Sequence, residues 1–304
     1  MRGCLLLLWP AWLCFAPSPL LRRLLAGGWT FPTAQRLIHR GAVYVDGVCV
    51  RDPVKLVAQK SRVVAIQEGT EEAAEVPPNE DWYLKFFKPR GVISSHKQER
   101  YSRKPCTAEF FPPGAPSTLH NAGRLDGESE GLLLLTTDGH FSHFVTSPGK
   151  RFEKEYIALT NCAKDRKPPS SDCLRQLLSG VCLSDGHVVC AKSAEVIDFD
   201  GRFARLRLTV TAGRFRMVRR MLRAVGYSCL QLVRTSTCGV GGAVLRPRSM
   251  QEAAKEANKG ALKVEARPAT MAADPSCLQP GEYAPLEAAE VARIYARGLQ
   301  VDLG

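Results

Sequence analysis

Paired metal-ligand spacings are absent from this sequence. Its 11 cysteines include no Cys-x-x-Cys pair, and its 6 histidines are unclustered apart from His140 and His143, a pair more typical of a surface turn than of a metal site. Both features argue against a zinc site, and an odd number of scattered cysteines argues against a disulfide-stapled secreted scaffold. Most of the cysteines are expected to be small core residues in a reducing compartment.

Acidic residues are also missing from the beginning of the chain, since none occurs before Asp46. The apolar stretch Cys4–Phe15 is too short, and too closely followed by prolines, to predict a membrane span. Together with Arg22 and Arg23, it favours a targeting leader over residues 1–19, directed to an organelle such as a plastid or mitochondrion. The alternative is a misassigned start codon, in which case a cytoplasmic protein is expected.

Positive charge is in excess along the 304 residues, because Lys and Arg number 42 against 30 for Asp and Glu, a formal net charge of +12. That balance suits a polyanionic partner, since neutralising phosphates releases counterions and drives nucleic-acid binding. The length is sufficient for two domains.

Residues 20–66 form a first compact segment by their pattern. Leu20–Ala26 and Pro32–Gly41 predict helices, and Ala42–Val50 predicts a hairpin that turns at Asp46-Gly47. Arg36, His39 and Arg40 fall on the second helix. Residues 67–81 are acidic and proline-containing, which predicts a linker.

The most informative stretch runs from Gly123-Arg-Leu-Asp126 through four leucines, 132–135, to Thr-Thr-Asp-Gly139. An apolar run bounded by glycine predicts a short buried strand, so that Asp126 in the preceding loop would be held by a rigid scaffold. From the residues alone, Asp126 is a nucleophile, a lone acid or base, or merely a solvated charge beside Arg124. A glycosidase-type pair with Glu128 or Glu130 is disfavoured because all three would share one flexible turn.

The pattern of apolar and turn residues also predicts the elements of the other informative segments. Lys88-Pro-Arg-Gly91 ends a predicted strand, and Lys154–Thr160 predicts another strand that carries Tyr156. Gly213–Tyr227 predicts a helix with an apolar face and a dense basic surface. Residues 246–277 show little periodicity and predict an inserted, mostly disordered loop, whereas Glu287–Leu299 predicts a closing helix.

These blocks, in this order, resemble the RsuA-like ribosomal RNA pseudouridine synthases. The resemblance implies an α+β protein, with a small S4-like RNA-binding module at residues 20–66 followed by a catalytic domain at 82–299 on a mixed, largely antiparallel sheet. It implies isomerisation of uridine to pseudouridine in RNA, most naturally ribosomal RNA, by a monomer that needs no metal or redox cofactor.

The resemblance also implies residue roles. Asp126 is the expected catalytic carboxylate, Tyr156 the tyrosine against the target base, and Arg219 the basic partner of Asp126, with Arg124 as the alternative partner. The sequence departs from the family pattern at Arg216-Met217, where His-Gln is usual, and at Ala212, where Glu is usual, which keeps a catalytically inactive RNA-binding assembly factor as the rival hypothesis. The expected RNA-binding positions are Arg36, Arg40, Lys88, Arg90, Arg124, Lys154, Arg214, Arg216, Arg220 and Leu232.

Overall fold

The computed structural model describes residues 18–66, 73–95, 104–162, 166–242, 249–258 and 268–300. The expected leader therefore lies outside the described residues as far as position 17. By its internal contacts the chain divides into unit 1, which combines Met1–Tyr83 with Pro285–Gly304, and unit 2, Leu84–Ala284. Among the described residues, no helix has both the length and the apolar character of a membrane span.

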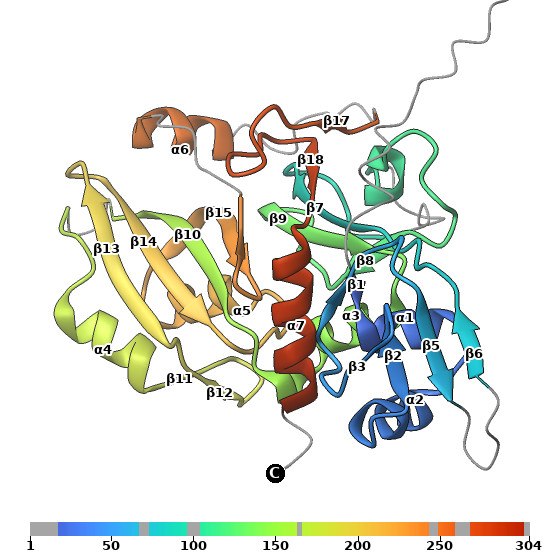
Figure 1. Ribbon diagram of the computed structural model, residues 1–304. Coiled ribbons are helices and arrows are strands. Elements are labelled where there is room, and N and C mark those ends of the chain that lie inside the picture. The colour runs from blue at the N-terminus through green and yellow to red at the C-terminus, as the bar shows by residue number, and fades with distance from the viewer. Residues whose placement is uncertain are drawn as a thin grey trace, which may run out of the picture. The chain divides into compact units, whose positions relative to one another are not determined.

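Unit 1 combines short helices with a four-stranded antiparallel sheet of order β3-β2-β5-β6 (Figure 1). The hairpin turn was predicted correctly: Asp46 and Gly47 have φ of 50° and 81°, as a tight turn between twisted strands requires. The elements of unit 1 are β1 (Ser18–Pro19), α1 (Leu20–Ala26), α2 (Phe31–His39), β2 (Val43–Val45), β3 (Val48–Cys49), β4 (Leu56–Val57), β5 (Val63–Ile66), β6 (Ala73–Val76) and α7 (Ala288–Gln300).

Two features of unit 1 differ from expectation. The segment expected to be a linker contributes strand β6, which pairs with β5 from Val76 to Ala73. The closing helix α7, expected within the catalytic domain, belongs to unit 1 and packs against β1 and β4. Its Val291, Ile294 and Tyr295 are buried, so an apolar face at helical spacing fixes that placement.

Unit 2 is built on a ten-stranded sheet with the path β13-β14-β10-β15-β9-β7-β18-β17, and with β16 on β15 and β8 on β9 (Figure 1). The β15–β9 and β17–β18 pairs are parallel, while β13–β14, β14–β10, β10–β15, β15–β16 and β8–β9 are antiparallel. A mixed, mostly antiparallel α+β fold is therefore confirmed.

The strands of unit 2 are β7 (Tyr83–Lys88, whose first residue falls in unit 1), β8 (His120–Ala122), β9 (Glu130–Thr136), β10 (Lys154–Asn161), β11 (Val181–Cys182), β12 (Val188–Val189), β13 (Ser193–Phe199), β14 (Phe203–Val210), β15 (Ser228–Thr237), β16 (Val240–Gly241), β17 (Thr270–Met271) and β18 (Glu282–Pro285). The helices of unit 2 are α3 (Gly139–Thr146), α4 (Ser171–Ser179), α5 (Met217–Ala224), α6 (Met250–Asn258) and the short 3-10 turns η2 (Thr107–Phe110) and η3 (Pro148–Lys150).

Strand β9 lies in the interior of this sheet, between β15 and β7. Its four leucines are at most 1 % exposed, as expected for a strand covered on both faces. The Asp138 side chain then accepts hydrogen bonds from the backbone N–H groups of His140 and Phe141, which caps α3 and ends the motif. The loop that enters β9 is thus attached to one of the most deeply buried parts of the molecule.

The prediction of an inserted, mostly disordered loop at 246–277 is wrong for the residues of that range that the structure describes. Residues 250–258 form α6, and Met250, Ala253, Ala254 and Ala257 are buried at the spacing of one helical face. Met250, Ala253 and Ala254 pack with Leu159 and Phe203. Small alanine side chains give a weak sequence signal, although they allow a helix to approach the sheet closely. Residues 243–248 and 259–267 lie outside the described residues.

Candidate active site

The Asp126 loop, residues 123–129, connects β8 to β9 and is fixed on both sides of the aspartate. The hydroxyl of Ser94 donates to the carbonyl of Leu125 at 2.8 Å and accepts from the N–H of Leu125 at 3.0 Å. On the other side, the N–H of Gly91 donates to the carbonyl of Gly127 at 2.7 Å. Asp126 itself is half-buried. The backbone that carries Asp126 is therefore held on both sides, and the residue keeps partial access to solvent, as a catalytic group requires.

Gly131, the second residue of β9, can only be glycine. Its φ is 108°, and a Cβ atom there would lie 2.3 Å from the carbonyl oxygen of Arg234 on β15. Gly131 pairs with Arg234, and Arg234 in turn pairs with Tyr156 on β10. Tyr156, half-buried, thus stands two strands away from the exit of the Asp126 loop, next to a register shift in β10.

A buried cation lies beside this loop. Lys88, at the end of β7, is 0 % exposed, and its ammonium donates to the carbonyls of Pro89 and Val92 at 2.9 Å each. The pKa of Lys88 is lowered to about 7, mainly by burial; the carboxylate of Glu130 opposes the shift, the charge of Arg234 adds to it, and the carboxylate of Asp126 opposes it.

Helix α5 holds the loop through Glu128 rather than through Asp126. Arg219 donates to the backbone carbonyl of Glu128 at 3.0 Å and to that of Cys229 at 2.9 Å. Arg216 forms an ion pair with the Glu128 carboxylate at 2.6 Å, and this contact holds the pKa of Glu128 below its usual range. The expected Arg219–Asp126 ion pair is absent from the described residues; the guanidinium is instead used to fix the backbone two residues after Asp126.

The expected RNA contacts separate into buried and surface groups. Lys88 and Leu232 are in the core, and Lys154 is half-buried with its ammonium on the Phe152 carbonyl at 3.1 Å, so none of the three lies on the open surface. An apolar strand environment explains the difference, since a lysine there must find backbone acceptors. Arg90 donates to the carbonyl of Ala257 at 3.0 Å.

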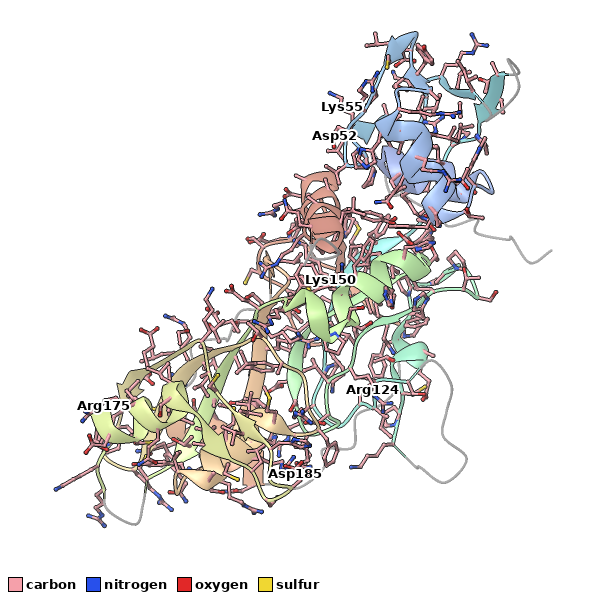
Figure 2. All side chains as sticks on the ribbon, turned by 90° about the horizontal axis from the view of Figure 1, so that it is seen from below. Asp52, Lys55, Arg124, Lys150, Arg175 and Asp185 are labelled. Atoms are coloured by element: carbon pink, nitrogen blue, oxygen red, sulfur yellow. The ribbon has the colours of Figure 1, made fainter. Side chains whose placement is uncertain are left out.

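The remaining expected contacts are accessible. Arg124 and Arg214 are exposed, whereas Arg220 is half-buried and bonded to Ser184 at 3.2 Å and to Asp185 at 2.8 Å. In Figure 2, Arg124 and Asp185 both lie toward the lower edge of unit 2, with Lys150 above them. In unit 1, α2 exposes Arg36, His39 and Arg40 and buries Ala34, Leu37 and Ile38.

A small pocket of about 120 Å³ lies at α5, and arginine side chains make up most of its lining. Burial raises the pKa of the Cys229 thiol in that pocket to about 11, so the thiol is neutral there. Within the ranges that the structure describes, no group of three His, Cys, Asp or Glu side chains could hold a metal ion. The pocket is suited to an anion such as a phosphate; its lining residues are Arg216, Arg219, Arg220, Arg223, Tyr227, Ser228 and Cys229.

Comparison with known proteins agrees with this geometry. Residues 83–224 match the family described as RNA pseudouridylate synthase. The chain is 33% identical to ribosomal large subunit pseudouridine synthase B of Bacillus subtilis over 203 residues, 66% of this chain and 77% of that protein. It is 29% identical to ribosomal small subunit pseudouridine synthase A of Escherichia coli over 262 residues, 86% of this chain and 92% of that protein.

A crystal structure of a pseudouridylate synthase shares the fold, with a TM-score of 0.52 and 24% identity over 91% of this chain and 99% of that one. The chain belongs to the RNA pseudouridine synthase family. Within that family it is an RsuA-like enzyme, an isomerase that converts uridine in RNA to pseudouridine.

Several residues of the site escaped the sequence interpretation. Ser94 and Glu128 hold the Asp126 loop, but a serine after a strand and a glutamate in a charged turn carry no distinctive signal. Arg234 is 3 % exposed and donates to the carbonyl of Leu132 at 2.7 Å. Its position in the apolar strand Leu230–Thr235 was the available clue, since a lone arginine in a buried strand needs a specific acceptor.

Proposed function

We propose that this enzyme modifies uridines of ribosomal RNA and that Asp126 is its catalytic carboxylate. The observation that carries the proposal is the setting of Asp126: the residue is half-buried, and Ser94 and Gly91 hold the loop backbone on either side of it. The ribosomal substrate is supported by the names of the relatives, which act on the large or the small ribosomal subunit.

The reaction defines what Asp126 must supply. The bond from N1 of the base to C1′ of the ribose breaks, the base turns over, and a bond from C5 to C1′ forms. The hydrogen on C5 leaves as a proton, and N1 takes up a proton, so that the product is an isomer of the substrate. The ionised carboxylate of Asp126 acts as nucleophile or base during these steps. The reaction is an isomerisation, so no group from outside the chain is required for the atoms to balance.

Tyr156 and Arg219 complete the proposed site in different ways. The target base must leave its stack to be turned over, and stacking on an aromatic ring is worth about 1–3 kcal/mol, so Tyr156 is assigned to hold the base. Arg219 is assigned a positioning role, because its two bonds join α5 and β15 to the backbone of the Asp126 loop.

RNA binding is assigned to two basic surfaces. In unit 1, residues 20–66 act as an S4-like module in which Arg36 and Arg40 on α2 meet phosphates. In unit 2, the backbone of the same RNA is proposed to contact the exposed Arg124 and Arg214 and the arginines that line the pocket at α5. We further propose a monomer that acts in an organelle, which the composition of residues 1–19 motivates.

The test uses ribosomal RNA tritiated at C5 of uridine, transcribed without modification. The full chain is expected to release tritium to water from one or a few sites of a ribosomal RNA, and far more slowly from a mixed transfer RNA fraction. Sequencing of the product should place each pseudouridine in the fraction that released tritium. Release from transfer RNA alone would overturn the ribosomal substrate, and release from neither RNA would overturn the proposed activity on purified RNA.

A further inference from the structure

Phe215 has an unusual position for an apolar side chain. It is 76 % exposed, the highest value among the large hydrophobic residues that the structure describes. No ring or cation contact involves it within the described ranges. One exposed aromatic residue is ordinary on a protein surface, so the argument rests on where this residue lies.

Phe215 is at the tip of a turn held against the Asp126 loop. The N–H of Met217 donates to the carbonyl of Arg214 at 3.2 Å, which closes the turn, and Arg216 adopts a left-handed backbone with φ of 49°. Such a conformation persists in a non-glycine residue only where the surroundings enforce it. The ion pair of Arg216 with Glu128 at 2.6 Å ties this turn to the Asp126 loop, and the preceding Phe215 side chain is exposed to solvent.

The surroundings of Phe215 indicate what would cover it. Arg214 precedes it and Arg216 follows it, and Arg219, Arg220 and Arg223 extend the positive surface along α5. An apolar protein partner gains little from so cationic a rim, whereas a nucleotide offers both a base for the ring and a phosphate for the arginines. Aromatic rings set among basic residues are the usual construction for single-stranded nucleic acid.

Resting on the proposed function, we propose that Phe215 stacks on a base that flanks the target uridine, while the neighbouring arginines bind the phosphates beside that base. Turning the target base out of its stack exposes the face of its neighbour, and an aromatic ring beside the Asp126 loop would cover that face. Phe215 would then contribute to substrate binding and to the choice of flanking nucleotide, without taking part in the chemistry.

The experiment compares two ligands of equal length: an oligouridylate and an abasic sugar–phosphate oligomer. Phe215→Ala is expected to weaken binding of the oligouridylate about 5- to 150-fold, the range for loss of one base–aromatic stack. Binding of the abasic oligomer should be unchanged, and Phe215→Tyr should restore most of the affinity. Arg214→Ala should weaken both ligands and flatten the salt dependence.

Val188→Ala provides the control, because Val188 is 71 % exposed on β12 and should leave both affinities unchanged. Equal losses of Phe215→Ala on both ligands, no loss on either, or no restoration by Phe215→Tyr in a variant with an unchanged melting transition would overturn the proposal. If the wild-type enzyme binds the oligouridylate but releases no tritium from ribosomal RNA, the proposed function fails while the assignment of Phe215 is still decided by the two binding curves.

Discussion

Two helices of this chain, α2 and α5, are both rich in basic residues, but those residues have different roles in the two helices. On α2 in unit 1, Arg36, His39 and Arg40 are exposed on the face opposite the buried Ala34, Leu37 and Ile38. On α5 in unit 2, the arginines that lie nearest to Asp126 are half-buried and bonded to the protein itself. Arg216 and Arg219 hold Glu128, and Arg220 holds Asp185.

The difference shows that a count of basic residues does not predict their role. An exposed arginine contributes to RNA affinity through counterion release and is screened by salt. An arginine that is bonded to a loop beside the catalytic carboxylate contributes mainly to geometry, where a small displacement of the reacting groups is costly. Changes on α2 are therefore expected to alter binding, and changes around α5 and the Asp126 loop to alter turnover or folding.

The largest expected effect concerns the buried cation behind this loop. The pKa of Lys88 is about 7 in the folded protein, below the value of about 10.4 in an unfolded chain. Between these values the unfolded chain binds more protons, so the free energy of unfolding should rise with pH by about 1.4 kcal/mol per unit relative to Lys88→Met. Below about pH 7 the difference between the two proteins should be constant.

Urea denaturation of both proteins at a series of pH values measures this difference, and ionisation of the buried cysteines cancels from it. A difference that is flat from pH 7 to 10 would mean that the Lys88 ammonium keeps an ordinary pKa in the folded protein, which would contradict its desolvation at the end of β7.

Gly131→Ala should break the loop itself. The new Cβ would meet the backbone of Arg234 at 2.3 Å, and alanine disfavours a φ of 108°, so a loss of about 3 kcal/mol or more in unfolding free energy is expected. Gly139→Ala is the matched control, because no atom lies within 4 Å of its added Cβ at the start of α3. If Gly131→Ala and Gly139→Ala both unfold at the same temperature as the wild type, the described close approach of β9 to β15 is wrong.

Glu128→Gln should separate turnover from stability. Its ion pair with Arg216 is about half exposed and is expected to contribute no more than about 1 kcal/mol to folding. Because the pair fixes the turn before α5, kcat for tritium release should still fall by roughly tenfold. Glu195→Gln, which removes the ion pair with Arg207 between β13 and β14, should change neither quantity. Equal kcat values for the two variants would show that α5 does not position the loop.

The smallest effect is expected from changes to the exposed arginines of unit 1. Replacing Arg36 and Arg40 with alanine should weaken RNA binding several-fold and reduce the slope of log affinity against log salt by roughly 1 to 2, with kcat at saturating RNA unchanged. Arg175→Ala on α4, labelled in Figure 2, removes an exposed arginine that pairs with Asp172 and should leave the slope intact. A fall in kcat for the α2 variant would contradict the division of roles.

The sequence was sufficient for elements with a strong local period. The four leucines of β9, the Asp46-Gly47 hairpin and the apolar face of α5 follow the predicted spacing, since burial leaves that pattern in the chain. Asp126, Tyr156 and Arg219 were selected by resemblance, and the structure brings Tyr156 and Arg219 to the strands and helix around the Asp126 loop.

What the sequence could not supply are contacts between distant segments. The Ser94 bonds to Leu125 join residues 31 positions apart, and the Glu128–Arg216 pair joins residues 88 positions apart. Helix α6 was missed because alanine-rich faces resemble linker composition. The depth of Lys88 was missed because a lysine before Pro-Arg-Gly has the composition of a solvated turn, whereas its ammonium is enclosed by backbone carbonyls.

Asp126→Asn gives the most direct test of the central claim. The substitution keeps the size of the side chain and removes its negative charge, so at RNA concentrations that saturate both proteins it should release no tritium from C5 of uridine while binding RNA as the wild type does. Release at the wild-type rate from the purified variant would contradict the account, because the carboxylate in the loop that Ser94 and Gly91 hold would then have no part in the reaction.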